Sequence, residues 1–131
     1  MGETAAKHGV TNLIPMARAA DVQRSVDFYK LLGMELRGSL KNDVGGLQLA
    51  HVSCEQADLM FARASEPVIA SHRAVLFYLY ATDLVALREH LLAHGIRVSA
   101  ITYPDYMPKG EMRVEDPDGY CLLIGQSWVM R

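Results

Sequence analysis

RVEDPDGYCLLI, from Arg113 to Ile124, has the pattern of a strand, a tight turn and a second strand. In the turn, Pro117 presets its own φ at about −65°, the aspartates can cap the local backbone, and Gly119 accepts the positive φ that other residues resist. Residues 120–124 form an aromatic and aliphatic run of strand length. A hairpin of this kind occurs in many folds, so its meaning depends on the rest of the chain.

The rest of the chain repeats one pattern, because a shift of 62 residues places residues 21–36 on residues 83–98. Asp21 and Asp83 both suit a helix N-cap, and Gly33 and Gly95 both stand where a helix ends. Strand-like runs surround the two helices at Val10–Ala17, Met34–Leu40, Leu47–Cys54, Leu59–Arg63, Ala74–Ala81 and Ile96–Ile101. The repeat predicts an α+β fold of two tandem βαβββ modules.

We expect one domain over residues 1–131, because the chain is too short for two independent cores. The first module covers about residues 10–66 and the second about residues 72–127, and Ser65–Ser71 is the best linker candidate. The net charge of −2 argues against nucleic acid as a partner, and no apolar run is long enough to cross a membrane. Cys54 and Cys121 lie far apart, which favours reduced thiols and a cytoplasmic location.

Three segments carry a family resemblance: AADVQRSVDFYKLLGMEL, LYATDLVALREHLLAHGIRV and GEMRVEDPDGYCLLIGQ. In this order and spacing they resemble the vicinal oxygen chelate superfamily, which includes glyoxalase I, extradiol dioxygenases, and the bleomycin and fosfomycin resistance proteins. The resemblance runs from about Asn12 to Gln126. It implies a cup-shaped mixed sheet with helices on the outside, a ligand cavity inside, and assembly with a second subunit.

Metal-dependent members hold a divalent ion in the cup with His, Gln or Glu side chains from four strands. The motifs place those four positions at Ile14, near Met60, and at Phe77 and Leu123. None of these side chains coordinates a hard divalent metal. The departure resembles the bleomycin-resistance branch, whose members sequester a ligand without a catalytic metal, so we expect no cofactor.

Several histidines are candidates for a site. His51 lies inside a strand, and it is the best acid–base or ligand-binding residue if it faces the cup. If it faces outward, it is a hydrogen-bonded surface histidine, and strand parity alone leaves both orientations open. His90 and His94 have the one-face spacing of a metal pair on a helix, but no third ligand is evident and exposed side chains are the simpler expectation.

The loop Thr102–Gly110 is long and aromatic for a hairpin connection. Tyr103 and Tyr106 in this loop either grip a flat ligand at the mouth of the cup or cover a dimer seam. Glu111 and Arg113 share one strand face, where Arg113 either binds an anionic ligand or pairs internally with Glu111.

Strand parity with the matched positions predicts which residues line the cup: Ile14, Met16, Val75, Phe77, Leu79, Cys121 and Leu123. Tyr78, Tyr80, Leu122 and Ile124 are then expected to face the helices. Such an apolar lining suits an apolar or aromatic ligand, and it equally suits a cup filled by its own side chains.

The sequence therefore predicts a homodimer that binds an apolar or aromatic small molecule in a metal-free cup. The expected ligand-binding residues are His51, Phe77, Tyr103, Tyr106, Arg113 and Leu123, with no catalytic residue. One alternative is a glyoxalase-type lyase or dioxygenase that uses non-standard ligands such as His51, His72 and Glu111. A second alternative is a structural or regulatory dimer without a small ligand.

Overall fold

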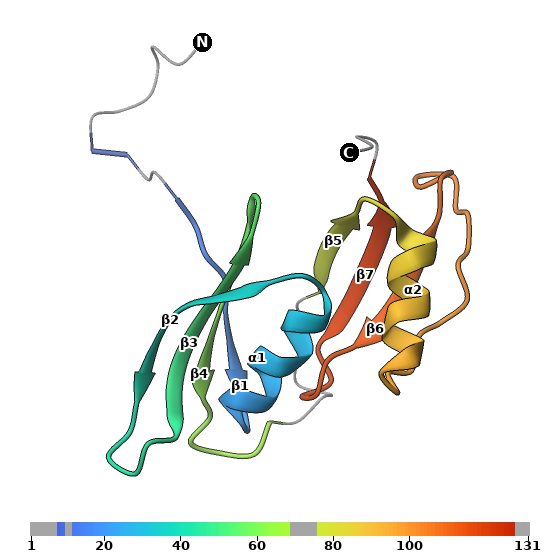
Figure 1. Cartoon of the computed structure of the whole chain (residues 1–131). Coiled ribbons are helices and arrows are strands. Elements are labelled where there is room, and N and C mark those ends of the chain that lie inside the picture. Colours follow the sequence, from blue (N-terminus) through green and yellow to red (C-terminus); the bar gives the residue numbers. More distant parts are fainter. Residues whose placement is uncertain (1–7, 10–11, 69–75, 128–131) are drawn as a thin grey trace.

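The structure is a computed structural model that describes residues 8–9, 12–68 and 76–127. The elements along the chain are β1 (Met16–Ala19), α1 (Val22–Leu31), β2 (Glu35–Lys41), β3 (Leu47–Cys54), β4 (Ala57–Arg63), β5 (Phe77–Ala81), α2 (Leu84–Ala93), β6 (Glu111–Glu115) and β7 (Cys121–Gln126). His72, Val75 and the end of the predicted linker lie outside the described residues. The elements confirm the predicted α+β fold of βαβββ modules (Figure 1).

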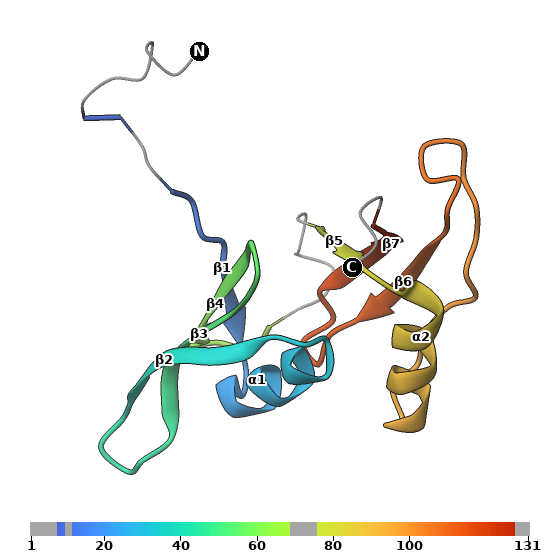
Figure 2. The same ribbon diagram turned by 45° about the horizontal axis from the view of Figure 1, so that its top comes forward.

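Each module contributes a separate mixed sheet. The first has the strand order β1-β4-β3-β2 and the second has the order β5-β7-β6. The pairs β1–β4 and β5–β7 are parallel, and the other pairs are antiparallel. In each module the helix packs against the sheet of that module, α1 on the first sheet and α2 on the second (Figure 2). Each sheet therefore has one face covered by its helix and one face turned away from it.

The second module departs from the prediction at residues 96–101, which were expected to form a regular strand. Here the chain makes isolated bridges with β6, from Val98 to Val114 and from Thr102 to Glu111. The Ser99 hydroxyl accepts a hydrogen bond from the Arg113 amide at 2.8 Å, in place of a backbone carbonyl. A side chain that replaces a ladder partner interrupts the regular pairing.

Both helices begin and end as the repeat predicts. The carboxylate of Asp21 accepts a hydrogen bond from the Arg24 amide, and that of Asp83 accepts one from the Ala86 amide, each at 3.1 Å. Gly33 and Gly95 take φ values of 93° and 78°, which are strained for any residue with a Cβ. The repeated residues thus perform the same backbone function in each module.

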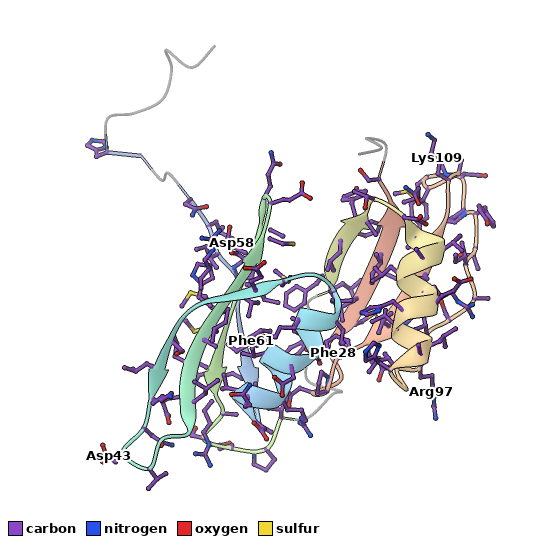
Figure 3. All side chains as sticks on the ribbon, in the orientation of Figure 1. Phe28, Asp43, Asp58, Phe61, Arg97 and Lys109 are labelled. Carbon is purple, nitrogen blue, oxygen red and sulfur yellow. The ribbon has the colours of Figure 1, made fainter. Side chains whose placement is uncertain are left out.

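The core lies between each helix and the sheet beneath it. In the first module, Tyr29 of α1 packs against Phe61, which is labelled beside α1 in Figure 3, with ring centroids 5.0 Å apart. In the second module, Leu84 and Leu91 of α2 are buried in the same core as a set of strand residues: Met112, Val114, Leu122 and Ile124. No helix in the described part of the chain is long and apolar enough to cross a membrane.

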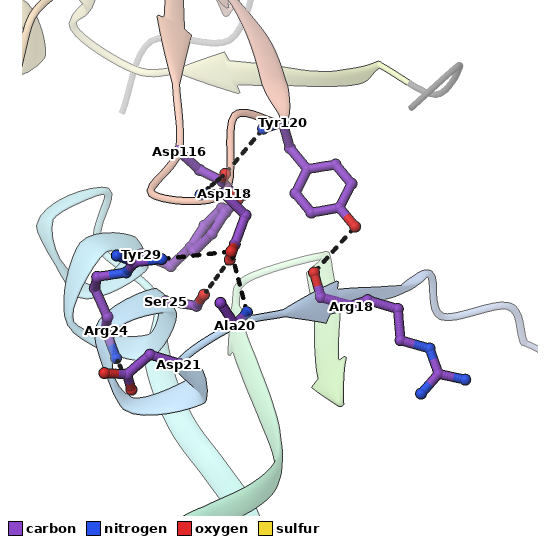
Figure 4. Close-up of polar contacts among 9 residues, drawn as sticks. All are labelled: Arg18, Ala20, Asp21, Arg24, Ser25, Tyr29, Asp116, Asp118 and Tyr120. Carbon is purple, nitrogen blue, oxygen red and sulfur yellow. Dashed lines mark hydrogen bonds and ion pairs between the residues drawn. The ribbon is translucent and has the colours of Figure 1, made fainter. Parts of the chain in front are cut away.

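The β6–β7 turn joins the second module to the start of α1 (Figure 4). The buried carboxylate of Asp118 accepts hydrogen bonds from the Ala20 amide at 3.0 Å and the Ser25 hydroxyl at 3.3 Å, and it pairs with Arg24 at 3.4 Å. Tyr120 donates its hydroxyl to the Arg18 carbonyl at 3.0 Å. The motif predicted as a local turn therefore also holds the two modules together.

Asp116 organises the turn itself. One oxygen of Asp116 accepts the amides of Asp118 and Tyr120 at 2.8 and 2.9 Å, and the other accepts the Tyr29 hydroxyl at 2.9 Å. Burial raises the pKa of Asp116 above its ordinary value, and these hydrogen bonds only partly oppose that shift. The folded protein therefore holds the Asp116 proton more tightly than the unfolded chain does.

We expect Asp116→Asn to gain stability relative to the original protein as the pH rises from about 3.5 to 7. The stability provided by the Asp116 proton is complete below the unfolded pKa and is lost as the pH rises through the raised folded pKa. Asparagine keeps an oxygen for the two amides and does not ionise. Urea unfolding of both proteins across this range measures the effect, and a constant difference in their free energies of unfolding would contradict it.

Candidate functional site

The candidate site consists of the two sheet faces that point away from the helices, here called the first and second open faces. On the first open face, Met16, Met60 and His51 lie side by side on β1, β4 and β3. Their neighbours Ala17, Phe61 and Ala50 are buried on the opposite face, beneath α1. The register therefore places His51 on the face of the first sheet that α1 does not cover.

His51 is held in place by a carboxylate on the next strand. Its Nε2 atom lies 2.8 Å from Oδ1 of Asp58, and both side chains are about one third exposed. A carboxylate partner fixes the orientation of the imidazole ring and leaves Nδ1 for another contact. The first open face thus has an oriented polar group among methionine side chains.

The second open face contains two rows of neighbouring residues. Tyr78, Leu123 and Arg113 form one row across β5, β7 and β6. Tyr80, Gly125 and Glu111 form the next row on the same strands. Leu123 and Arg113 therefore share a face, as expected, and two tyrosines that were expected to face α2 lie beside them.

Phe77 was predicted to line the cup, and the register shows that this orientation is wrong. Phe77 lies beside Leu122, and Leu79 lies beside Ile124, so both side chains pack on the core face under α2. The prediction located the cup-facing residues of β5 by their distance from the helix cap, and this distance was wrong by one residue. Since side chains alternate along a strand, an error of one residue exchanges the two faces.

Glu111 is the best-connected side chain on the second open face. It is 8% exposed, and its two carboxylate oxygens accept the hydroxyls of Tyr78 at 2.6 Å and Tyr106 at 2.8 Å. Burial and the bond to Glu111 raise the pKa of Tyr78, and the bond to Glu111 is the main cause of the raised pKa of Tyr106. Both phenols therefore keep their protons and continue to donate.

The internal pair proposed between Glu111 and Arg113 is absent. In the part of the chain that the structure describes, no lysine, arginine or histidine lies within ion-pair distance of Glu111. Arg113 is exposed one row away from Glu111. The sequence showed that these two residues share a face, but strand parity did not connect Glu111 to its tyrosine partners, which come from β5 and from the loop before β6.

The loop that precedes β6 sends its two tyrosines to opposite sides of the sheet. Tyr106 reaches Glu111 on the second open face, and Met107 is buried against Gly125 beside the Tyr78 hydroxyl. Tyr103 instead lies near Gly110 together with Leu84 of α2 and Ile101. The structure therefore brings Tyr106 together with Arg113 and Leu123, and it separates Tyr103 from them.

A hollow of about 540 Å³ lies between the modules. It is lined by the β3–β4 turn at residues 54–57, by residues 32–34, and by part of the second module that includes Tyr78 and Tyr80. None of the six residues predicted to bind ligand lines this hollow. Tyr78 and Tyr80 connect it to the second open face.

Potential metal ligands are scattered over the described residues. Within residues 8–9, 12–68 and 76–127, no three His, Cys, Asp or Glu side chains gather closely enough to hold a metal ion. His90 and His94 lie against each other on exposed helix surface, with ring centroids 4.5 Å apart, and Nδ1 of His94 contacts the His90 carbonyl oxygen at 2.9 Å. His72 lies outside the described residues and is not part of this comparison.

Comparison with protein families gives one match over most of the chain. The model of the "Glyoxalase/Bleomycin resistance protein/Dioxygenase superfamily" matches residues 13–124. No curated protein matches this sequence.

Solved structures with the same fold include binding proteins and an enzyme. A bleomycin resistance determinant encoded on the transposon Tn5 is 16% identical, with a TM-score of 0.72 over 92% of this chain and 100% of that one. A bleomycin-binding protein in complex with bleomycin is 18% identical, with a TM-score of 0.63 over 90% of this chain and 99% of that one. A lactoylglutathione lyase from Agrobacterium tumefaciens is 19% identical, with a TM-score of 0.65 over 90% of this chain and 95% of that one.

Proposed function

Because the chain belongs to the glyoxalase/bleomycin resistance protein/dioxygenase superfamily, we propose that it binds an aromatic or apolar small molecule without a catalytic metal. Binding buries and stacks the ligand against the open faces and changes no covalent bond. The observation that carries this proposal is the exposure of Met16, Tyr78, Tyr80 and Tyr106 on those faces. Exposed aromatic and apolar side chains beside a few fixed polar groups are typical of ligand sites.

The polar groups on the two open faces support the same proposal. His51 with Asp58 on the first face, and Arg113 with Glu111 on the second, can orient a ligand whose main contact is apolar. Of the positions that the family resemblance assigns to metal ligands, Ile14, Met60 and Leu123 have side chains that do not suit a hard divalent ion, and Phe77 packs on the core face. The names of two structural neighbours, a bleomycin resistance determinant and a bleomycin-binding protein, are consistent with ligand capture.

The proposed working form is a cytoplasmic homodimer in which a second copy covers the open faces. Exposed side chains such as Met16, Tyr78 and Tyr80 lie on the open faces of a single chain, so a ligand that contacts them is buried only when another surface closes over it. The two cysteines form no disulfide, which suits a reducing compartment.

A glyoxalase-type enzyme is the second candidate, because His51 is oriented by Asp58 on an open face. In that case His51 takes part in acid–base chemistry or holds a metal together with a non-standard ligand. The response of the protein to metal ions and chelator separates this candidate from the binding protein.

We expect bleomycin or a planar aromatic compound from a small panel to raise the melting temperature in the presence of EDTA. A ligand at about 100 times its Kd stabilises the folded state by about 2.7 kcal/mol, a shift on the order of 10 °C for a domain of this size. Tyr106→Ala should reduce the shift because it removes a ring from the second open face. Thermal unfolding with and without each compound measures both effects.

The same samples provide the controls. Val85→Ala alters an exposed side chain on α2, away from the open faces, and should leave the ligand-induced shift unchanged. Native mass spectrometry reports the number of subunits and any bound metal. If only Zn²⁺, Ni²⁺, Mn²⁺ or Fe²⁺ stabilises the protein, and EDTA abolishes this, the enzyme becomes the better assignment.

A further inference from the structure

The second open face contains a nearly buried carboxylate, Glu111, that forms no ion pair with any basic side chain among the described residues. Glu111 is 8% exposed, and its oxygens accept only the phenol hydroxyls of Tyr78 and Tyr106 within the described chain. Two neutral donors satisfy its hydrogen bonding but leave its negative charge in place. A carboxylate held away from water without a positive partner is costly, so a cation at this position is favoured.

The surroundings of Glu111 are aromatic and open to solvent. Tyr78, Tyr80 and Tyr106 are 39%, 61% and 66% exposed, and the rings of Tyr78 and Tyr80 lie 5.3 Å apart at an interplanar angle of 45°. Aromatic ring faces attract organic cations, most strongly when several rings surround the charge. The tyrosine rings therefore favour a bound cation at this position, as the carboxylate of Glu111 does.

A glycine separates Tyr80 from Glu111 in their row across the sheet. Tyr80 and Glu111 lie on the outer strands β5 and β6, with Gly125 of β7 between them. Since Gly125 has no side chain, the Tyr78 hydroxyl and the buried Met107 occupy the space above it. The Tyr78 hydroxyl above Gly125 is the one that donates to Glu111, and the ring of Tyr80 lies beside that of Tyr78.

The neighbouring arginine does not take the place of a ligand. Arg113 lies on the same face in the adjacent row, but it is exposed and makes no ion pair with Glu111. Its charge is directed into solvent, where water and salt screen it.

We propose that Glu111 and the tyrosines at 78, 80 and 106 bind the ammonium group of an aromatic amine or quaternary ammonium ligand. This inference rests on the proposed small-molecule function and specifies the class of molecule bound. Glu111 supplies the opposite charge, the tyrosine rings supply cation–π contacts, and the rest of the ligand lies on the apolar part of the second open face.

The test compares benzyltrimethylammonium with benzyl alcohol, which has the same ring but no charge. Titration followed by NMR of the tyrosine rings gives both affinities for the full chain. We expect the cation to bind about tenfold more tightly than the alcohol. This comparison uses the original protein and does not depend on the folding of a variant.

Glu111→Gln keeps an acceptor for the tyrosines and removes the charge. It should abolish the preference for the cation and leave the affinity for benzyl alcohol within about twofold, since the alcohol has no charge to lose. Tyr80→Leu should weaken cation binding about fivefold, because it removes one ring face. Glu89→Gln removes the same charge from exposed α2 and is the matched control, for which no change is expected.

The outcomes separate this inference from the function on which it rests. If the cation and the alcohol bind equally, or if Glu111→Gln leaves the preference unchanged, the ammonium site is wrong while aromatic binding stands. If neither probe binds and the aromatic panel also fails to stabilise the protein, both proposals are wrong.

Discussion

Asp118→Ala is expected to lower the free energy of unfolding by about 3 kcal/mol, because it leaves the buried Ser25 hydroxyl and the part-buried Ala20 amide without an acceptor. The Ala20 amide and the Ser25 hydroxyl lose their partner, and Arg24 loses its counterion. These contacts join the second module to the start of α1, so the variant loses stability because the two modules are held together less tightly (Figure 4). Urea unfolding measures the change.

Hydrogen exchange at the Ala20 amide tests the cause of this loss. The amide is bonded to Asp118 across the junction, and its protection should fall in the variant more than that of amides inside β3. Asp43→Ala removes a carboxylate from the exposed turn after β2 and is the matched control, with an expected change below about 0.5 kcal/mol. An Asp118→Ala protein as stable as this control would show that the contacts do not hold the modules together.

The features that the sequence predicted well depend on local backbone chemistry. Asp21 and Asp83 cap their helices through the amides three residues later, and Gly119 takes a φ of 85° in the β6–β7 turn. Each of these features is determined within four or five residues. The 62-residue repeat then combined local features into two modules, which is why the element order was predictable.

The candidate site was less predictable because it depends on strand phase and on contacts between distant residues. The β5 strand has aromatic or aliphatic residues at every position, so its hydrophobic pattern does not distinguish the two faces. The structure therefore has Tyr78 on the open face and Phe77 on the core face, the reverse of the prediction. The partnership of Glu111 with Tyr78 and Tyr106 also requires the loop to fold over the sheet, and no periodicity in the sequence encodes that path.

The two open faces present different chemistry. The first has thioethers and an oriented imidazole, and the second has tyrosine rings around a carboxylate. The β6–β7 turn determines how these faces are placed relative to each other, because it docks on α1 through Asp118. The sequence motif that defines the fold thus also positions the proposed ligand surfaces.

Gly125→Val is expected to remove most of the affinity for the benzyltrimethylammonium probe and to lower the free energy of unfolding by about 2 kcal/mol. A Cβ at position 125 would lie 2.9 Å from Cε of Met107 and 3.2 Å from the Tyr78 hydroxyl, so both groups must move. The two methyl groups of valine extend further toward this crowded region, so we expect the Tyr78 hydroxyl to shift from its 2.6 Å contact with Glu111. Thermal unfolding and NMR titration measure the two effects.

Gly38→Val is the matched control for this steric argument. Gly38 lies on β2 beside His51, and a Cβ there would meet no atom within 4 Å. Neither glycine has a positive φ, so the two substitutions differ in the space around the new side chain rather than in backbone strain. We expect Gly38→Val to retain the stability and the cation affinity of the original protein. Equal behaviour of the two variants would mean that the contacts above Gly125 do not shape the site, because only one of the two new side chains displaces Tyr78 from Glu111.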